Sequence, residues 1–166
     1  MPVENWRWLA AIIAAHPNHE VVGRTRLQKS IWLLQRLGMP TDYVYSLHFY
    51  GPYSEEVRAD TSFAELSCSI SESARTAQDG TEYFILSAEP SSSLPNVDQF
   101  RQHINILANE DPTVLELAAT YDAFRKMGLG HQDAIESLRA KKGPKCGAGR
   151  EGQAISLLQR LGLPAA

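Results

Sequence analysis

A short β-hairpin signal is the feature that most constrains the fold. Two segments, 69–77 and 81–87, are predicted to be strands, and Gln78-Asp79-Gly80 separates them. An Asp-Gly pair in so short a connection favours a tight turn between antiparallel strands. Most of the remaining chain has apolar residues at helical spacing. A hairpin among helices predicts an α+β domain.

Two helices are predicted before this hairpin. Apolar residues at helical spacing cover 3–15. Thr25, followed three residues later by Gln28, has the pattern of a capping box and places the start of a second helix there. Gly38 and Pro40 would end that helix.

A strand and a third helix are expected next. Aromatic and β-branched residues alternate over 43–50, which favours a strand. Gly51-Pro52 would then break the strand. Ser54 is suited to cap a helix that runs to about residue 66, and two glutamates follow it where a helix N-terminus favours negative charge.

The order of the predicted elements suggests a winged-helix-like unit at 1–88, and the composition of 89–96 suggests a linker. Apolar residues at helical spacing predict a helical unit at 97–166. Because 166 residues with 43% hydrophobic content suit one core, the two units are expected to form one compact domain. A winged helix usually has its first strand between the first two helices, whereas here the strand is expected after the second. The helices predicted in the second unit are 97–108, 112–127 with Asp111 as its cap, 131–140, and one that ends at residue 161.

The chain is expected to be cytoplasmic. No apolar run approaches the roughly eighteen residues that a membrane helix needs. A secretory signal is not evident, so Cys68 and Cys146 are expected to stay reduced.

The charges are unevenly distributed along the chain. Residues 1–60 are neutral, residues 61–119 carry −7 and residues 120–166 carry +4, within a net charge of −3. A dedicated duplex-binding domain is usually clearly basic, because phosphate contacts supply most of its non-specific affinity. Only a local patch of this chain could bind nucleic acid.

One face of the second helix combines basic and aromatic residues. At about 100° per residue, Arg26, Lys29, Trp32 and Arg36 fall on the same side. This face could dock a protein or an anion, because tryptophan and arginine suit such contacts. Alternatively, Trp32 packs against the helix over 3–15 while the basic side chains reach solvent.

The segment HFYGPYSEEV, 48–57, also has two interpretations. His48, Tyr50 and Tyr53 could surround a pocket whose floor is the N-terminus of the next helix. Alternatively, the segment is a strand-to-helix turn with the tyrosines at the edge of the core. We favour the turn and keep a binding rim as the second interpretation.

No catalytic residue, metal site or cofactor is predicted. A dinucleotide-binding fingerprint directly follows a strand, but no strand is predicted before the GAGREG sequence at 147–152. His16 and His19 lack further ligands at metal-binding spacing. Neighbouring lysines would lower the pKa of Cys146, but no base or oxyanion hole is evident. An enzyme is therefore not expected.

Several segments together resemble the YwgA-like family of small bacterial and archaeal proteins. They are GRTRLQKSIWLLQRLG at 23–38, the segment 48–57, LELAATYDAF at 115–124, Lys-Gly-Pro-Lys at 142–145 and ISLLQRLGLP at 155–164. This resemblance covers nearly the whole chain and implies an architecture rather than a reaction.

The helix with Leu-Gln-Lys and the Tyr-Gly-Pro that follows are similar, over about 24–70, to Panacea-type domains. That likeness implies a role as an antitoxin or as an adaptor that brings partners to proteases. Ser30 departs from the pattern, because an apolar residue would be usual after Leu-Gln-Lys.

We therefore predict a non-enzymatic regulatory or adaptor protein that binds a protein partner, with an antitoxin or defence setting implied by the distant likeness. A homodimer is compatible with the sequence, and the oligomeric state is left open. The residues predicted to contact a protein partner are Arg24, Arg26, Lys29, Trp32, Arg36, His48, Tyr50 and Tyr53. The alternative is a nucleic-acid-binding transcriptional regulator that uses Arg24, Arg26, Lys29, Lys141, Lys142, Lys145 and Arg150.

Overall fold

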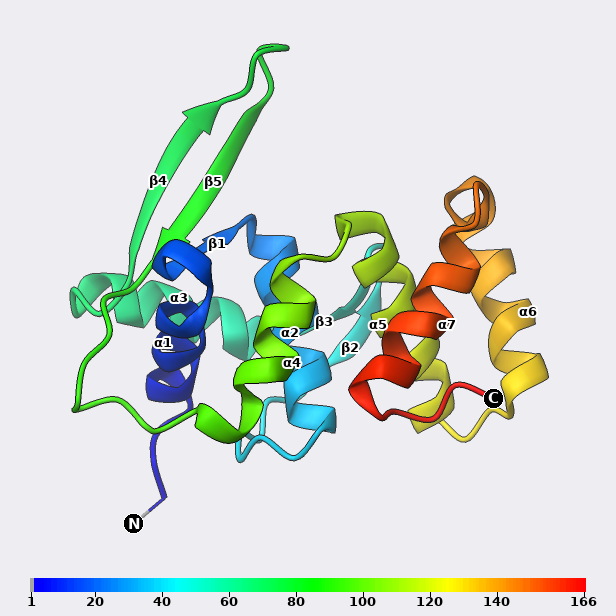
Figure 1. Cartoon of the computed structure of the whole chain (residues 1–166), viewed down its shortest axis with the longest axis horizontal. Helices are drawn as coiled ribbons and strands as arrows, with labels where there is room; N and C mark the ends of the chain where they lie inside the picture. Colours follow the sequence, from blue (N-terminus) through cyan, green and yellow to red (C-terminus); the bar gives the residue numbers. More distant parts are fainter. Residues whose placement is uncertain (1) are drawn as a thin grey trace.

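The computed structural model describes residues 2–166 and has the predicted α+β class (Figure 1). Helices and two small antiparallel sheets make up the described part of the chain. The elements are α1 (Asn5–Ala15), β1 (Glu20–Val22), α2 (Arg24–Arg36), β2 (Ser46–His48), β3 (Gly51–Tyr53), α3 (Glu55–Leu66), β4 (Ser71–Thr76), β5 (Glu82–Ser87), α4 (Arg101–Ala108), α5 (Pro112–Lys126), α6 (His131–Lys142) and α7 (Arg150–Leu161), with short 3-10 helices at Pro17–His19, Asp98–Phe100 and Gly143–Cys146.

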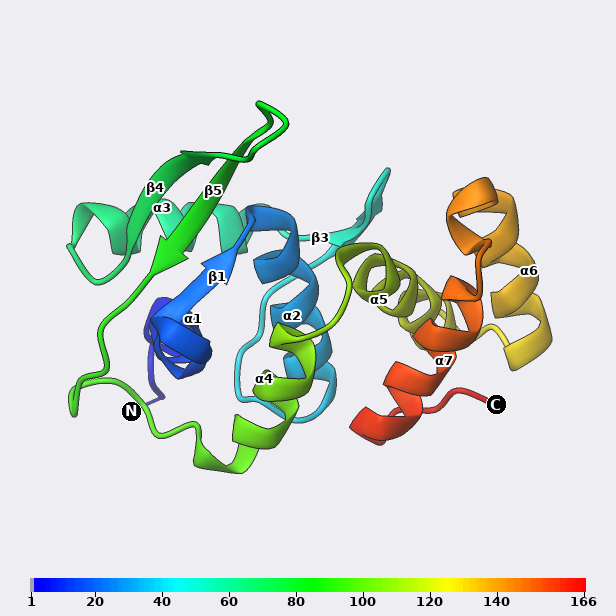
Figure 2. The ribbon, with the colours of Figure 1, turned by 45° about the horizontal axis from the view of Figure 1, so that its top comes forward.

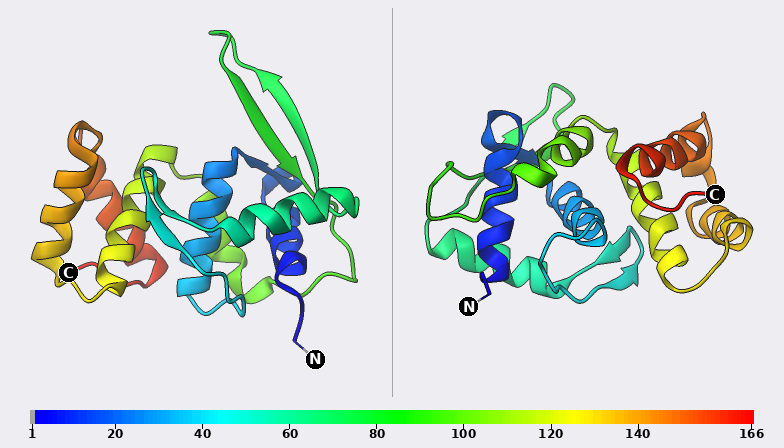
Figure 3. Two further views of the ribbon diagram at one scale, coloured as in Figure 1. Left: turned by 180° about the vertical axis from the view of Figure 1, so that it is seen from behind. Right: turned by 60° about the horizontal axis from the view of Figure 1, so that its bottom comes forward.

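The predicted hairpin is confirmed as β4 and β5, which project from the body of the molecule (Figures 1 and 3). The sheet has a third strand that the sequence did not reveal, because β1 pairs antiparallel with β5 and places Val21 opposite Leu86. β1 is only three residues long, so it has almost no alternation to detect. It supplies a strand between α1 and α2, where the sequence analysis expected none.

The prediction of one strand over 43–50 is wrong. The chain forms a second, smaller hairpin instead, with β2 and β3 joined by Phe49 and Tyr50 and with His48 opposite Gly51. Gly51 has a φ of +99°, which a side chain rarely tolerates. The glycine thus opens the returning strand, and Pro52 lies inside β3 rather than in a strand-breaking turn.

Two of the three predicted helix caps are confirmed. The Ser54 side chain accepts from the Val57 amide, and Asp111 accepts from the amides of Thr113 and Val114. The capping box at Thr25 is wrong, because the helix starts earlier and Thr25 lies within its first turn, after Gly23 as the N-cap.

Helix α5 is the central element of the core. Its middle residues are buried, and it contacts α2 and β3 on one side and α6 and α7 on the other (Figure 2). Helix α4, which follows the irregular segment 88–97, contacts α1 and α2. Within residues 2–166, no helix is both long and apolar enough to cross a membrane.

Replacing Gly51 with alanine tests the close approach of β3 to α5. A Cβ at this position would lie 2.5 Å from Thr120 Oγ1, in addition to the cost of the positive φ. We expect Gly51→Ala to lower the free energy of unfolding by about 2–4 kcal/mol in a urea titration.

Gly80→Ala is the matched control. Gly80 also has a positive φ, but a Cβ there would meet no atom within 4 Å. We expect a loss of only about 1 kcal/mol. Equal losses in the two variants would contradict the close packing of β3 on α5.

Candidate functional site

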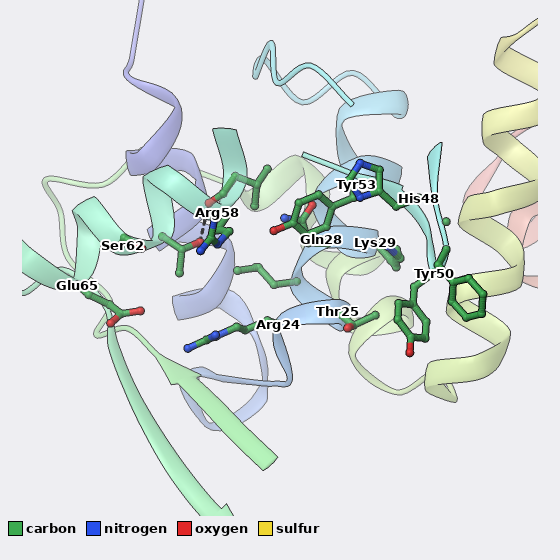
Figure 4. Close-up of a pocket in the computed structure, with 15 residues that line it drawn as sticks. Arg24, Thr25, Gln28, Lys29, His48, Tyr50, Tyr53, Arg58, Ser62 and Glu65 are labelled. Atoms are coloured by element: carbon green, nitrogen blue, oxygen red, sulfur yellow. Dashed lines mark hydrogen bonds between the residues drawn. The ribbon is translucent and has the colours of Figure 1, made fainter. Parts of the chain in front are cut away.

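A groove lies between α2, α3 and the β2–β3 hairpin, with a volume of about 570 Å³ (Figure 4). It brings together five of the predicted site residues from three different elements: Arg24, Lys29, His48, Tyr50 and Tyr53. The remaining lining residues include Gln28, Arg58 and Glu65, which were not predicted.

Two side chains of α2 fix the wall of this groove. Gln28 is buried and bonds both backbone groups of Ser54: its Nε2 donates to the carbonyl at 2.9 Å, and its Oε1 accepts from the amide at 2.9 Å. Lys29 Nζ donates to the Pro52 carbonyl at 2.7 Å. The Leu-Gln-Lys helix and the Gly-Pro-Tyr-Ser segment are therefore joined by direct hydrogen bonds that satisfy buried backbone groups.

Lys29 belongs to a cluster of charges that also contains the buried Glu116 and Lys142 and the partly exposed Lys145. The Glu116 carboxylate lies 3.0 Å from Lys145 Nζ and 3.5 Å from Lys142 Nζ. Lys142 Nζ also donates to the Phe49 carbonyl at 2.8 Å, at the turn of the small hairpin. Burial lowers the pKa of Lys29 to about 8, against the opposing effect of Glu116.

The hairpin carries aromatic rings at its tip and on its groove side. His48 and Tyr53 stack with their ring centroids 4.9 Å apart. Phe49 and Tyr50 form the turn and are 78% and 56% exposed. Lys145 Nζ lies 5.0 Å from the centroid of the Tyr50 ring, so the charge cluster contacts the exposed tip through Lys145.

The predicted docking face of α2 is not an exposed surface. Trp32 is only 5% exposed and its indole Nε1 donates to Asp122 at 3.0 Å, while Arg36 pairs with the same carboxylate at 2.8 Å. The alternative interpretation is confirmed for the burial of Trp32, and the aromatic ring that contacts Trp32 is that of Tyr45, with ring centroids 5.0 Å apart. Asp122, a buried acid on α5, binds both Trp32 and Arg36, and the pattern of α2 alone could not reveal it.

The other basic residues of the prediction are mostly engaged within the chain. Arg26 donates to the carbonyls of Leu107 and Glu110, at 2.8 and 2.7 Å, and Arg24 forms an ion pair with Glu72.

In the basic segment near the C-terminus, Arg150 donates to the Lys145 carbonyl at 2.7 Å and Lys142 is buried. Lys141 is exposed. The predicted nucleic-acid residues thus do not form a set of free cations.

The reactive side chains named from the sequence have structural partners or surroundings. His16 and His19 contact the carbonyls of Ile12 and Ala14, at 2.7 and 2.6 Å, through Nδ1. Burial and Glu151 raise the pKa of Cys146, which corrects the prediction of a lowered value. Within residues 2–166, no three His, Cys, Asp or Glu side chains are grouped as a metal site.

Glu116, the acid of the charge cluster, is a further residue that the sequence analysis missed. It is a lone acid within an apolar stretch, Leu115 to Ala119, of a helix that is buried on most sides. An acid in such a stretch signals a buried ion pair, since burying an unpaired charge is costly. The identity of its lysine partners could not be read from spacing, because they come from α6 and from the 3-10 helix that follows it.

The comparisons with known proteins are partial. A 38-residue stretch of the chain is 47% identical to the Uncharacterized protein YwgA of Bacillus subtilis (strain 168). The match covers 23% of this chain and 23% of the length of that protein. No protein-family model matches the chain. Similarity to YwgA is thus confirmed over part of the chain, and the Panacea-type resemblance stays a prediction.

Gln28→Ala tests the role of α2 in holding the groove wall. The substitution leaves the buried Ser54 amide without a partner and removes one of the two hydrogen bonds to the Ser54 carbonyl, which also accepts from the Arg58 amide at 3.3 Å. We therefore expect a loss of about 1–3 kcal/mol in the free energy of unfolding. Gln132→Ala, at a surface position of α6, is the control and should change stability by less than about 0.5 kcal/mol. Similar values for both variants would contradict the proposed bracing.

The lowered pKa of Lys29 predicts a pH dependence of stability. The pKa of Lys29 is about 8 in the folded chain and 10.5 ordinarily, so between these pH values the unfolded chain binds more protons than the folded one. The free energy of unfolding should therefore rise with pH across this window. Below the window Lys29 is charged in the folded chain, and the full cost of burying that charge lowers the free energy of unfolding. The rise from Lys29 alone is at most about 3 kcal/mol.

The measurement is the difference between the wild type and Lys29→Met in urea titrations from about pH 7 to about pH 10. Subtraction removes the contributions of tyrosines and other lysines. Lys126→Met, an exposed position, is the control and should show no such difference. A difference that is independent of pH would rule out a depressed pKa at Lys29.

Proposed function

We propose that this protein is a non-enzymatic regulatory or adaptor protein that binds a segment of a protein partner in the groove. The observation that carries the proposal is the pair of exposed aromatic side chains, Phe49 and Tyr50, at the tip of the small hairpin. Hydrogen bonds from Lys29 and Lys142 hold the backbone of this hairpin in place. Large aromatic residues on a preorganised support are typical of the energetic centres of protein interfaces.

The lining of the groove supports recognition rather than chemistry. Gln28 is occupied by Ser54, the Thr61 hydroxyl donates to the Val57 carbonyl at 2.7 Å, and His48 is stacked on Tyr53. A nucleophile needs a base within hydrogen-bond reach. Gln28, Lys29 and Thr61 are instead bonded to the backbone. Charged side chains of both signs also line the groove, which suits a peptide.

The nucleic-acid alternative has weaker support. The order of α1, β1, α2, α3 and the β4–β5 hairpin is compatible with a winged-helix-like unit, in which α3 would enter the major groove of DNA. The first turn of α3 carries Glu55 and Glu56, both exposed. Their charges would repel phosphates.

Site-specific photo-cross-linking in the organism that encodes the protein tests the proposal. A photoreactive phenylalanine analogue at position 49 should give a discrete protein adduct. The same analogue at Met127, which is 61% exposed on another part of the surface, should not give that adduct. Absence of a protein adduct specific to position 49 would contradict the proposed function.

Fluorescence anisotropy with labelled nucleic acids distinguishes the nucleic-acid-binding alternative from the proposed function. Binding to phosphates weakens steeply as the salt concentration rises, and we expect no such binding of duplex or single-stranded nucleic-acid probes. Salt-sensitive binding that is lost in Arg26→Glu/Lys29→Glu, with the fold retained, would instead favour the nucleic-acid-binding regulator.

A further inference from the structure

Lys29 has an unusual position for a charged side chain. It is 2% exposed, and within residues 2–166 the Pro52 carbonyl is the one hydrogen-bond acceptor found for its Nζ. No carboxylate of this part of the chain lies within ion-pair distance of it. An ammonium has three N–H donors, so two remain for a ligand.

The nearest candidate counter-charge is already shared. Glu116 pairs with both Lys142 and Lys145, so the cluster holds three ammonium groups and one carboxylate. Two of these lysines, Lys29 and Lys142, are buried. Buried charges in proteins are normally paired, because desolvation of an unpaired charge is costly. The cluster therefore has an excess of buried positive charge beside the groove.

The groove is polarised along its length. Lys29 and Tyr50 lie toward one end and Glu65 lies at the other (Figure 4). Between them, Arg24 is paired with Glu72, and Arg58 lies 3.4 Å from Glu55. These arginines already have acidic partners, so Lys29 is the cation of the lining that lacks one.

From this geometry we propose that the groove recognises a carboxylate of the partner segment, bound at Lys29 with the rest of the segment running toward Glu65. This inference rests on the proposed function and names the chemistry of the partner. The carboxylate comes from the C-terminus of the partner or from an Asp or Glu side chain. The bond to Pro52 is kept, because the ligand uses the remaining donors of Lys29.

In this proposal, a ligand reaches Lys29 when side chains move, and the backbone keeps its position. His48 and Tyr50 flank this end of the groove, and both are exposed on the hairpin. Rotamer changes of exposed side chains take place in picoseconds to nanoseconds. The backbone beneath them stays fixed by Gln28, Lys29 and Lys142.

Affinity selection from a random heptapeptide pool tests the inference. The pool is prepared once with free C-terminal carboxylates and once as C-terminal amides, and the peptides retained by the immobilised full-length protein are sequenced by mass spectrometry. Retention of the free form alone identifies a C-terminal carboxylate. Retention of both forms with enrichment of Asp or Glu identifies a side chain.

Lys29→Met should reduce retention about tenfold or more, because a charge-assisted hydrogen bond is lost. Lys126→Met removes an exposed lysine of α5 outside the groove and should retain peptides as the wild type does. Retention that is independent of carboxylates, or no retention from either pool, overturns the inference. A protein adduct at position 49 that persists despite this result leaves the proposed function standing.

A second test uses only the wild type, so its result does not depend on whether the Lys29→Met variant folds. The lysine side chains are labelled with ¹³C, and the Cε resonance of Lys29 is followed with pH in sodium chloride and in sodium acetate at equal ionic strength. Binding of acetate favours the charged ammonium, so acetate should raise the pKa of Lys29 above its value in chloride. An unchanged pKa would overturn the inference.

Discussion

The hydrogen bonds from Gln28 and Lys29 of α2 to the backbone of β3 and Ser54 are the contacts on which the groove depends. Ser54 is held at its amide and its carbonyl by Gln28, while its own hydroxyl caps α3. One residue thus fixes both the end of the hairpin and the start of the next helix. The stacked His48 and Tyr53 rings and the exposed tip receive their positions from this anchored backbone.

The buried charges connect the two halves of the chain. Glu116 of α5 attracts Lys142 and Lys145, and Lys142 reaches the Phe49 carbonyl at the turn of the small hairpin. Gly51 allows β3 to approach α5, because a Cβ there would meet Thr120. The C-terminal helices therefore support the hairpin from the side opposite the groove-forming α3. The cost of desolvating the lysines is only partly offset by one carboxylate, which is why a ligand carboxylate is the natural complement.

Local signals predicted much of the fold and little of the site. Side chains that cap their own helix, such as Ser54 and Asp111, and the Asp-Gly turn act over a few residues, so they could be read from the sequence. The three-residue β1 and the reversal at Gly51 depend on distant partners and were missed or misread. His48, Tyr50 and Tyr53 line one groove, as the second of the two interpretations of segment 48–57 expected. The pairing of Trp32 and Arg36 with Asp122 was not foreseen, because it joins residues about ninety positions apart.

Native-state hydrogen exchange at the Ser54 amide tests the central claim most directly, that α2 holds the groove wall through side-chain bonds. This amide precedes α3 and bonds to Gln28 Oε1 rather than to a backbone carbonyl. We predict that it exchanges as slowly as the core amides of α5, and that Gln28→Ala abolishes this protection while the α5 amides keep most of theirs. Fast exchange at Ser54 in the wild type, at the rate of an open loop, would contradict the account.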